Sequence, residues 1–407
     1  MDKDTYLILR VTGDDRDVAD ALSTPASRSE SPPESTRNIE YRVDAEELDR
    51  QDFQRLRHDR EVKAIAQPMP LRLIAPVSHS GPAAGRVPIH GATWGVYVTG
   101  ALQSPYIGHR VTVAILDTGI KADHEAFRGI ELIQEDFTGE GNGDKHGHGT
   151  HVAGTIFGQT LHGVRYAVAP GVRRALIGKV LGMERSATTK ELVDAVLWAV
   201  KEGAQIINMS LGIDFPGRVR WWVEEEGLEA DLATSRVLAE YRDNVRLLDN
   251  LVNLLRAGSA QYPSALIVAA AGNESKRDVR PDYVIQVAPP AAADGIVAVA
   301  AVQTVGEPHS VLTVAPFSNI HPAVSGPGVN IYSTWNDGRY AFLDGTSMAS
   351  PHVAGLAALW AERQLKRYGL VNPDSLEAQL RGQSRLDRLP SANYLDVGEG
   401  LATAPLD

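Results

Sequence analysis

Apolar and polar positions alternate in long blocks from about residue 92 onward. Near-continuous apolar runs recur there, as expected for strands buried on both faces of a parallel sheet: RVTVAILDTG, RALIGKVL, AQIINMSLG, SALIVAAAGN and GIVAVAAV. Amphipathic segments lie between them, such as TKELVDAVLWAVKEG, with Leu192, Val196 and Ala199 on one helical face. The alternation predicts an α/β fold with a doubly wound, mainly parallel sheet, whose site lies at the carboxyl ends of its strands.

Residues 1–75 form a unit with a different pattern. TYLILRV, NIEYRV and REVKAIA predict three strands. A polar helix is predicted from Asp14 to Leu22, and a second helix from Ala45 to about His58, where apolar positions recur at helical spacing: Leu48, Phe53 and Leu56. The Ser/Pro-rich stretch STPASRSESPPESTRN predicts a flexible loop, and the Pro and Gly content of residues 76–91 predicts a linker.

Residues 214–240 interrupt the alternation with an acidic insertion that contains WWVEEEGLEADL. Beyond it, apolar residues spaced by 3 and 4 predict a helix that packs against another helix: Leu238, Tyr241, Val245, Leu248, Val252 and Leu255. One interpretation is a core-facing helix with a surface insertion. The other is a lid or a docking element for a protein partner within residues 214–255.

Composition narrows the class of protein. The 407 residues carry a net charge of −11 without a long basic block, which argues against nucleic acid as a partner. There is no cysteine, so disulfides and thiolate metal sites are excluded. No apolar run approaches the roughly 18 residues of a membrane helix. No signal peptide is visible, so we expect a cytoplasmic protein as written, or a secreted one if a signal was trimmed.

The sequence VAILDTGI places Asp117 at the mouth of a buried strand. Aspartic proteases carry such an Asp-Thr-Gly loop, but they need two carboxylates that share a proton. Only one such loop occurs here. The alternative is an aspartate that orients a histidine.

The stretch DKHGHGTHVAGT places His146, His148 and His151 in a glycine-rich turn before an apolar run. A metal site is one interpretation, because imidazoles are common ligands. However, no acidic partner stands at a recognised metal spacing, and the glycines predict a tight turn rather than an HExxH-type helix. The run from Val152 favours a helix whose first turn presents one histidine to a cleft.

The stretch LDGTSMASPHVAGLAALW places Ser347 among small residues before an apolar helix. Pro351 is compatible with a helix that starts near Ser347. Backbone N–H groups point outward at such a start, where they would stabilise an oxyanion. Taken alone, the serine could equally be an ordinary N-cap.

Together, LDTGI, HGTHVAGT and GTSMASPHVAG resemble the three signature motifs of the subtilisin-like serine proteases, the subtilases. NMSLG, AAAGN and APFSN resemble further family segments, and NYLDVGEGLATA resembles the family's carboxyl end. The resemblance covers about Trp94 to Ala404, so the catalytic domain is assigned to residues 92–407. It implies a serine endopeptidase that works through an acyl-enzyme, with a peptide or protein as substrate.

The resemblance also implies a role for each matching residue. Ser347 would be the nucleophile, His148 the general base and acid, and Asp117 the residue that orients the imidazole. Asn273 would donate to the oxyanion together with the Ser347 N–H. His151 is then expected to be structural.

Substrate binding in this family is similar to β-augmentation, in which an extended peptide pairs between two edge segments. The resemblance implies that these segments are Ser210, Leu211, Gly212 and Ile213 on one side and Glu184, Arg185, Ser186 and Ala187 on the other. The family often has a second glycine where this chain has Ile213, which is expected to narrow or reshape the wall of the S1 pocket.

Two departures from the family pattern concern calcium. The loop IFGQTLHGVRYAVAP replaces an Asn-rich segment, and Ala126 replaces an acidic ligand. A hard cation wants several oxygen ligands, so we expect the family's strong calcium site to be absent and no cofactor to be required. Metal ligands are therefore not assigned.

Residues 1–75 resemble the family's propeptide, a small α+β domain of ferredoxin-like type that assists folding and plugs the cleft. The resemblance implies a self-inhibited precursor that cleaves itself somewhere within residues 73–91. An unrelated accessory domain is the alternative. Two narrower functions also stay open: a dedicated processing protease for one substrate, and a permanently shut protease fold that binds a partner.

Overall fold

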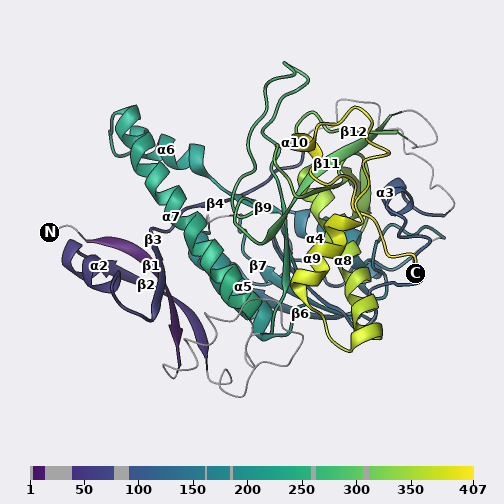
Figure 1. Cartoon of the computed structure of the whole chain (residues 1–407), viewed down its shortest axis with the longest axis horizontal. Helices are drawn as coiled ribbons and strands as arrows, with labels where there is room; N and C mark the ends of the chain where they lie inside the picture. The colour runs from purple at the N-terminus through teal and green to yellow at the C-terminus, as the bar shows by residue number, and fades with distance from the viewer. Residues whose placement is uncertain are drawn as a thin grey trace.

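The computed structural model describes residues 3–13, 39–77, 91–160, 163–183, 187–257, 263–305 and 311–407. The predicted first helix, Asp14 to Leu22, and most of the predicted linker lie outside these residues. No described helix is both long and apolar enough to cross a membrane. Figure 1 shows a small N-terminal unit set against one side of a larger α/β body.

The larger body is built on a mainly parallel sheet of order β12–β11–β10–β8–β5–β7–β6, with β13 paired to β11. Only β12 runs antiparallel to its neighbour. The strands are β5 (Thr112–Asp117), β6 (Glu131–Asp136), β7 (Arg174–Lys179), β8 (Ile206–Met209), β10 (Leu266–Ala270), β11 (Ile296–Val305), β12 (Val311–Val314) and β13 (Val324–Pro327). The five apolar runs of the sequence form β5, β7, β8, β10 and β11, which confirms the predicted fold class. The less apolar edge strands were not predicted.

Helices cover both faces of this sheet. Along β5, Val113 and Ile115 join the hydrophobic cluster of α4 (His148–Phe157) and α8 (Thr346–Tyr368). Ala114 and Leu116 join the opposite cluster, with α5 (Thr189–Lys201) and α7 (Ala230–Ala257). Successive side chains of a strand point to opposite faces, so a strand buried on both sides must be apolar throughout.

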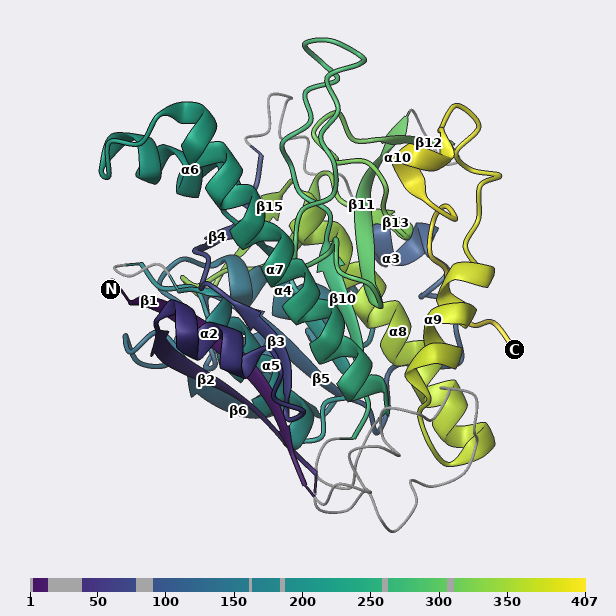
Figure 2. The same ribbon diagram turned by 60° about the vertical axis from the view of Figure 1, so that its left-hand side comes forward.

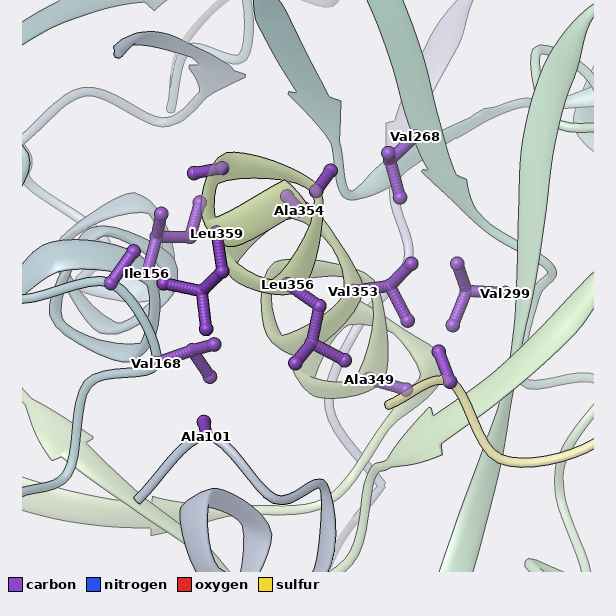
Figure 3. Packing of buried hydrophobic residues seen from close by; sticks show 14 of the residues in the cluster. Ala101, Ile156, Val168, Val268, Val299, Ala349, Val353, Ala354, Leu356 and Leu359 are labelled. Atoms are coloured by element: carbon purple, nitrogen blue, oxygen red, sulfur yellow. The ribbon is translucent and has the colours of Figure 1, made fainter. Parts of the chain in front are cut away.

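Helix α8 lies in the middle of one of these clusters (Figure 3). Its side chains point in several directions, Ala349 and Val353 toward Val299 and Leu359 toward Ile156. All five residues are fully buried. A helix that is apolar around its circumference is an interior helix, and α8 therefore anchors the residues of its first turn.

Several smaller elements complete this body. They are α3 (Trp94–Val98), η2 (Glu125–Phe127), the hairpin of β14 (Ile331–Thr334) and β15 (Tyr340–Leu343), α9 (Pro373–Gly382) and α10 (Tyr394–Val397). Helix α9 packs on α8, and α10 lies near β11.

The N-terminal unit is an antiparallel sheet in which β1 (Asp4–Thr12) lies between β2 (Glu40–Leu48) and β3 (Val62–Ala66). The predicted second helix is shorter than expected, because α2 spans only Arg50–Leu56. Residues 45–48 instead continue β2, where Ala45 pairs with Leu7. Asp49 then caps the helix, its side chain accepting from two backbone N–H groups.

The sheet of this unit is covered on both faces. Ile8 packs with Leu48 and Leu56 under α2. On the opposite face Leu7, Leu9 and Val11 share a hydrophobic cluster with α5 and α7. Figures 1 and 2 show α7 running along the boundary between the unit and the larger body. The unit therefore shares a core with the larger body.

The insertion forms α6 (Phe215–Glu224) and the first part of α7. The seam predicted for this helix is correct only in its second half. Leu238 is 57% exposed, and the first half buries Val237, Glu240 and Asn244 instead. The reason is that β3 and α6 both contact this part of α7, and Glu240 accepts from Arg218 and Trp222 of α6.

Glu362 of α8 holds the loop that leads into β5. Its Oε2 accepts from the N–H groups of Ile107, Gly108 and His109 at 2.7, 2.9 and 3.0 Å, and Lys366 lies 2.7 Å from Oε1. The side chain is nearly fully buried. Burial by itself raises the pKa of Glu362, but the bonds from Lys366 and the backbone outweigh it and hold the pKa below its ordinary value of 4.5.

We predict that Glu362→Gln, in an inactive Ser347→Ala background, lowers the free energy of unfolding at pH 7 by about 1–3 kcal/mol. A depressed carboxyl pKa stabilises the fold above the unfolded-state value, and this contribution fades as pH falls from about 4.5 through the folded-state pKa. Urea unfolding at pH 7 and pH 3.5 should thus show a smaller difference in the free energy of unfolding between the two proteins at the lower pH. Exposed Glu226→Gln is the control, and an equal loss at both pH values would contradict the role of the charge.

Candidate active site

Asp117 and His148 form a buried pair at the carboxyl edge of the sheet. Asp117 is the last residue of β5, and His148 is the first residue of α4. Asp117 Oδ1 lies 2.8 Å from His148 Nδ1, and neither side chain is exposed to solvent. Asp117 Oδ1 also accepts from the Thr118 N–H at 2.7 Å. The carboxylate thus fixes Nδ1 as the protonated nitrogen, which leaves Nε2 as an acceptor.

Two glycines allow α4 to begin this close to the strand. Gly147 has a positive φ of 105°, and a side chain there would collide with Trp335. A Cβ on Gly149 would lie 2.2 Å from the Gly119 carbonyl oxygen and 3.2 Å from Asp117 Oδ1. The glycines that predicted a tight turn in HGHGTH are therefore required by the approach of helix to strand.

Asp144 organises the same turn, and the sequence analysis missed it. Its Oδ1 accepts from Thr118 Oγ1 at 2.9 Å and from the Gly147 N–H at 2.7 Å. Its Oδ2 accepts from the N–H and the hydroxyl of Thr150 at 2.9 and 2.6 Å. The available signal was an aspartate a few residues before a helix start, a pattern typical of capping. Asp144 holds the loop after β5 against the first turn of α4.

His151 is buried and structural rather than part of the pair. Its Nε2 lies 3.0 Å from the Ile331 carbonyl oxygen and 3.2 Å from that of Ala341, so it ties α4 to β14 and β15. Burial, with a smaller effect from His148, lowers the pKa of His151 to about 3. No group of three His, Asp or Glu side chains suited to a metal occurs in the described part of the chain. Ala126 lies buried within η2.

Ser347 lies in the first turn of α8, which packs against α4. Asn273 stands beside this turn, and its Oδ1 accepts from the N–H and the hydroxyl of Thr346, each at 2.8 Å. Because both bonds are made to the oxygen, the amide group Nδ2 is turned away from the helix. Asn273 thus presents a donor next to Ser347.

The Ser210 side chain is buried beside the first turn of α8, while its carbonyl oxygen lies 3.5 Å from Ser347 Oγ. Pro351 lies within α8, beyond its first turn, so it cannot donate to the carbonyl oxygen of Ser347. The Ser210 hydroxyl donates to that oxygen at 3.3 Å and contacts the Ser350 hydroxyl at 2.9 Å. The fully buried Ser210 side chain therefore supports the turn that carries Ser347.

Residues 71–77 of the chain run as an extended segment beside Ser347. Strand β4 (Leu71–Leu73) pairs antiparallel with β9 (Leu211–Ile213), placing Leu71 opposite Ile213 and Arg72 opposite Gly212. On the other side the Leu71 N–H donates to the Ala187 carbonyl oxygen at 2.8 Å. The two segments expected to bind peptide thus flank an extended strand, although Glu184, Arg185 and Ser186 lie outside the described residues.

The segment runs directly past Ser347. Ser347 Oγ donates to the Ile74 carbonyl oxygen at 2.9 Å, and Asn273 Nδ2 donates to the Ala75 carbonyl oxygen at 3.0 Å. Ile74 is nearly fully buried, and its side chain faces Gly212. Meanwhile His148 Nε2 has no hydrogen-bond partner among the described residues. The Ser347 hydroxyl is engaged by the tail rather than by the histidine.

Comparisons with known proteins agree with this geometry. A sequence profile of the subtilase family matches residues 108–384, more than half of the chain. The thermostable alkaline protease of Halalkalibacterium halodurans is 33% identical over 323 residues, covering 78% of this chain and 72% of that protein. The major intracellular serine protease of Bacillus subtilis is 33% identical over 263 residues, covering 62% and 68%.

The thermophilic serine proteinase of Bacillus sp. strain AK1 is 31% identical over 258 residues, which cover 62% of this chain. The matched region spans about half of that relative, 52% of its length. The fold and site define a serine protease of the α/β type, and the chain belongs to the subtilase family, as a subtilisin-like serine endopeptidase. Residues 1–107 lie outside the matched profile.

We predict that Asn273→Ala lowers kcat for peptide hydrolysis by about 10²–10³-fold, because an oxyanion would lose a positioned donor. KM should change little, since the donor acts mainly on the transition state. Steady-state kinetics with a short peptide would measure both constants, and Asn253→Ala on the exposed side of α7 is the matched control. A kcat within threefold of the unmodified chain would remove Asn273 from the chemistry.

Proposed function

We propose that this chain hydrolyses peptide bonds by an Asp117–His148–Ser347 triad through an acyl-enzyme. The observation that carries the proposal is the 2.9 Å bond from Ser347 Oγ to the carbonyl oxygen of a peptide held as a strand in the cleft. The buried contact of His148 with Asp117 supports it, because it turns Nε2 into the free acceptor that a general base needs.

The reaction follows from these positions. Ser347 Oγ attacks the carbonyl carbon, and its proton passes to His148 Nε2, while Asp117 stabilises the imidazolium. Asn273 Nδ2 and the Ser347 N–H receive the developing oxyanion. The C–N bond then breaks as His148 returns the proton to the leaving nitrogen. Water, deprotonated by the same histidine, finally releases the acyl group from Ser347.

The N-terminal unit is proposed to inhibit this site within the same chain. It shares a hydrophobic cluster with α5 and α7, and its tail continues as β4 into the cleft. Contacts along the tail fix its course: Thr189 N–H donates to the Met69 carbonyl oxygen at 2.9 Å, and Asp214 N–H to that of Pro70 at 2.9 Å. The tail thus fills the groove where a substrate would pair.

The bond that would be cut is proposed to be Ile74–Ala75. Ser347 Oγ donates a hydrogen bond to the Ile74 carbonyl oxygen, and the Ile74 side chain lies buried against Gly212. Asn273 instead contacts the Ala75 oxygen, which would favour the next bond along. That next bond precedes Pro76, whose ring nitrogen carries no N–H and restricts the residue before it. The Ser347 contact therefore favours the Ile74–Ala75 bond.

A permanently shut binding protein is the alternative that the occupied cleft also supports. The two functions differ in whether the tail ever leaves. A narrower role as a dedicated processing protease is supported by α6, whose cap Asp214 directly follows β9 and whose body projects at the upper left of the molecule above β4 (Figure 2). Deleting α6 should then alter the choice of protein substrate and spare small peptides.

We expect the purified chain to split on incubation into an N-terminal fragment ending at Ile74 and a remainder beginning at Ala75, as shown by intact mass over time. Ser347→Ala should stay whole because it lacks the nucleophile, and Ser235→Ala on the exposed side of α7 should split normally. A C-terminal fragment that begins at Pro76 would place the cleaved bond one residue later, between Ala75 and Pro76. If neither the unmodified chain nor Ser347→Ala splits, the permanently shut binding protein is favoured.

A further inference from the structure

Arg72 of the tail lies between two carboxylates of the larger body. Its Nη2 is 2.5 Å from Glu274 Oε1, and its Nη1 is 3.8 Å from Asp214 Oδ1. All three side chains are about one-third exposed. Arg72 is also the residue of β4 that pairs with Gly212. A charged residue of the bound strand is thus recognised in the groove next to the nucleophile.

Both carboxylates are held in place by parts of the body other than the tail. Asn319 Nδ2 donates to Glu274 Oε2 at 2.7 Å, and Asn319 Oδ1 accepts from the Glu274 N–H at 3.1 Å. Asp214 caps α6 and accepts from the Gly217 N–H at 3.0 Å. Groups fixed before binding lose little conformational entropy when a ligand arrives. The pair therefore forms a site that exists before the strand enters.

The two carboxylates come from different segments and contact different nitrogens of Arg72. Asp214 directly follows the peptide-pairing strand β9, and Glu274 directly follows Asn273. Among the ion pairs of the described residues, neither carboxylate has a cationic partner besides Arg72. Departure of the tail would leave two negative charges facing the groove. A substrate with a neutral side chain there would leave them unpaired, whereas a cation would replace Arg72.

We propose that Asp214 and Glu274 form an acidic subsite that selects peptide segments with a basic residue two positions before the one that occupies the place of Ile74. The proposal rests on the proposed peptidase function and names its class of substrate. Arginine should be preferred over lysine, because two separate nitrogens of Arg72 reach the two carboxylates. A single ammonium group cannot span both in the same way.

The test uses the self-processed chain and three peptides that copy the tail, PLRLIAPV with arginine, lysine or glutamine at the third position. We expect kcat/KM for the arginine peptide to exceed that for the glutamine peptide by about fivefold, with lysine between, as a half-exposed ion pair implies. Glu274→Gln and Asp214→Asn should each reduce this ratio. Both keep the neutral hydrogen bonds, and asparagine still caps a helix. Exposed Glu226→Gln should leave the ratio unchanged.

Equal kcat/KM for the three peptides would overturn the subsite while leaving the peptidase intact. Absence of hydrolysis with every peptide would instead count against the proposed function. The subsite is therefore also tested by a measurement that does not depend on peptidase activity. In full-length Ser347→Ala, amide hydrogen exchange of residues 71–73 reports tail docking. Arg72→Gln and Glu274→Gln should each lower protection severalfold, and the double variant no further than either. Additive losses would overturn the pairing.

Discussion

Helices cover the central sheet on both sides, so its strands must bury both of their faces. That constraint forces β5 to be apolar from Val113 to Leu116, with alternate residues in opposite hydrophobic clusters. The first polar side chain that the strand can carry is therefore at its end, where Asp117 stands. Parallel strands end at one edge, and α4 and α8 bring His148 and Ser347 to the region beyond that edge. The position of the candidate site therefore follows from the burial of both faces of the sheet.

Because the site is shielded from solvent, the polar groups around it need hydrogen-bond partners within the protein. Asp144 accepts five hydrogen bonds around the start of α4, and the Ser210 hydroxyl donates to the Ser347 carbonyl oxygen, to which Pro351 cannot donate. Asn319 fixes the backbone after Asn273. These residues touch no reacting atom, yet they fix the geometry of those that do. Buried polar networks rigidify a site only when every member is bonded.

The N-terminal unit docks on α5 and α7, and its tail continues from there to Ser347. Its sheet buries Leu7, Leu9 and Val11 against α5 and α7, and full burial of each such side chain contributes about 1.5–3 kcal/mol. That docking places the tail at the start of α5 and beside β9, so apolar contacts far from Ser347 bring the Ile74 carbonyl oxygen to the Ser347 hydroxyl. Recognition along the tail is then divided between a buried Ile74 and a paired Arg72. The proposed inhibition and the proposed substrate preference therefore both rest on residues 71–75.

The sequence by itself determined the α/β class and five of the sheet strands, because buried strands leave local patterns. It also marked Asp117, His148, Ser347 and Asn273 as candidates, through glycine-rich turns at the ends of apolar runs and through the resemblance to the subtilases. It did not determine the edge strands or the end of β2, since pairing with β1 overrides the helical spacing of Leu48, Phe53 and Leu56. Only the tertiary structure decided that Leu238 faces outward, because β3 and α6 cover the other side of α7. Only the tertiary structure also brought Arg72, Asp214 and Glu274 together. They are far apart in the chain, and no local pattern records a contact that arises when three segments meet in one groove.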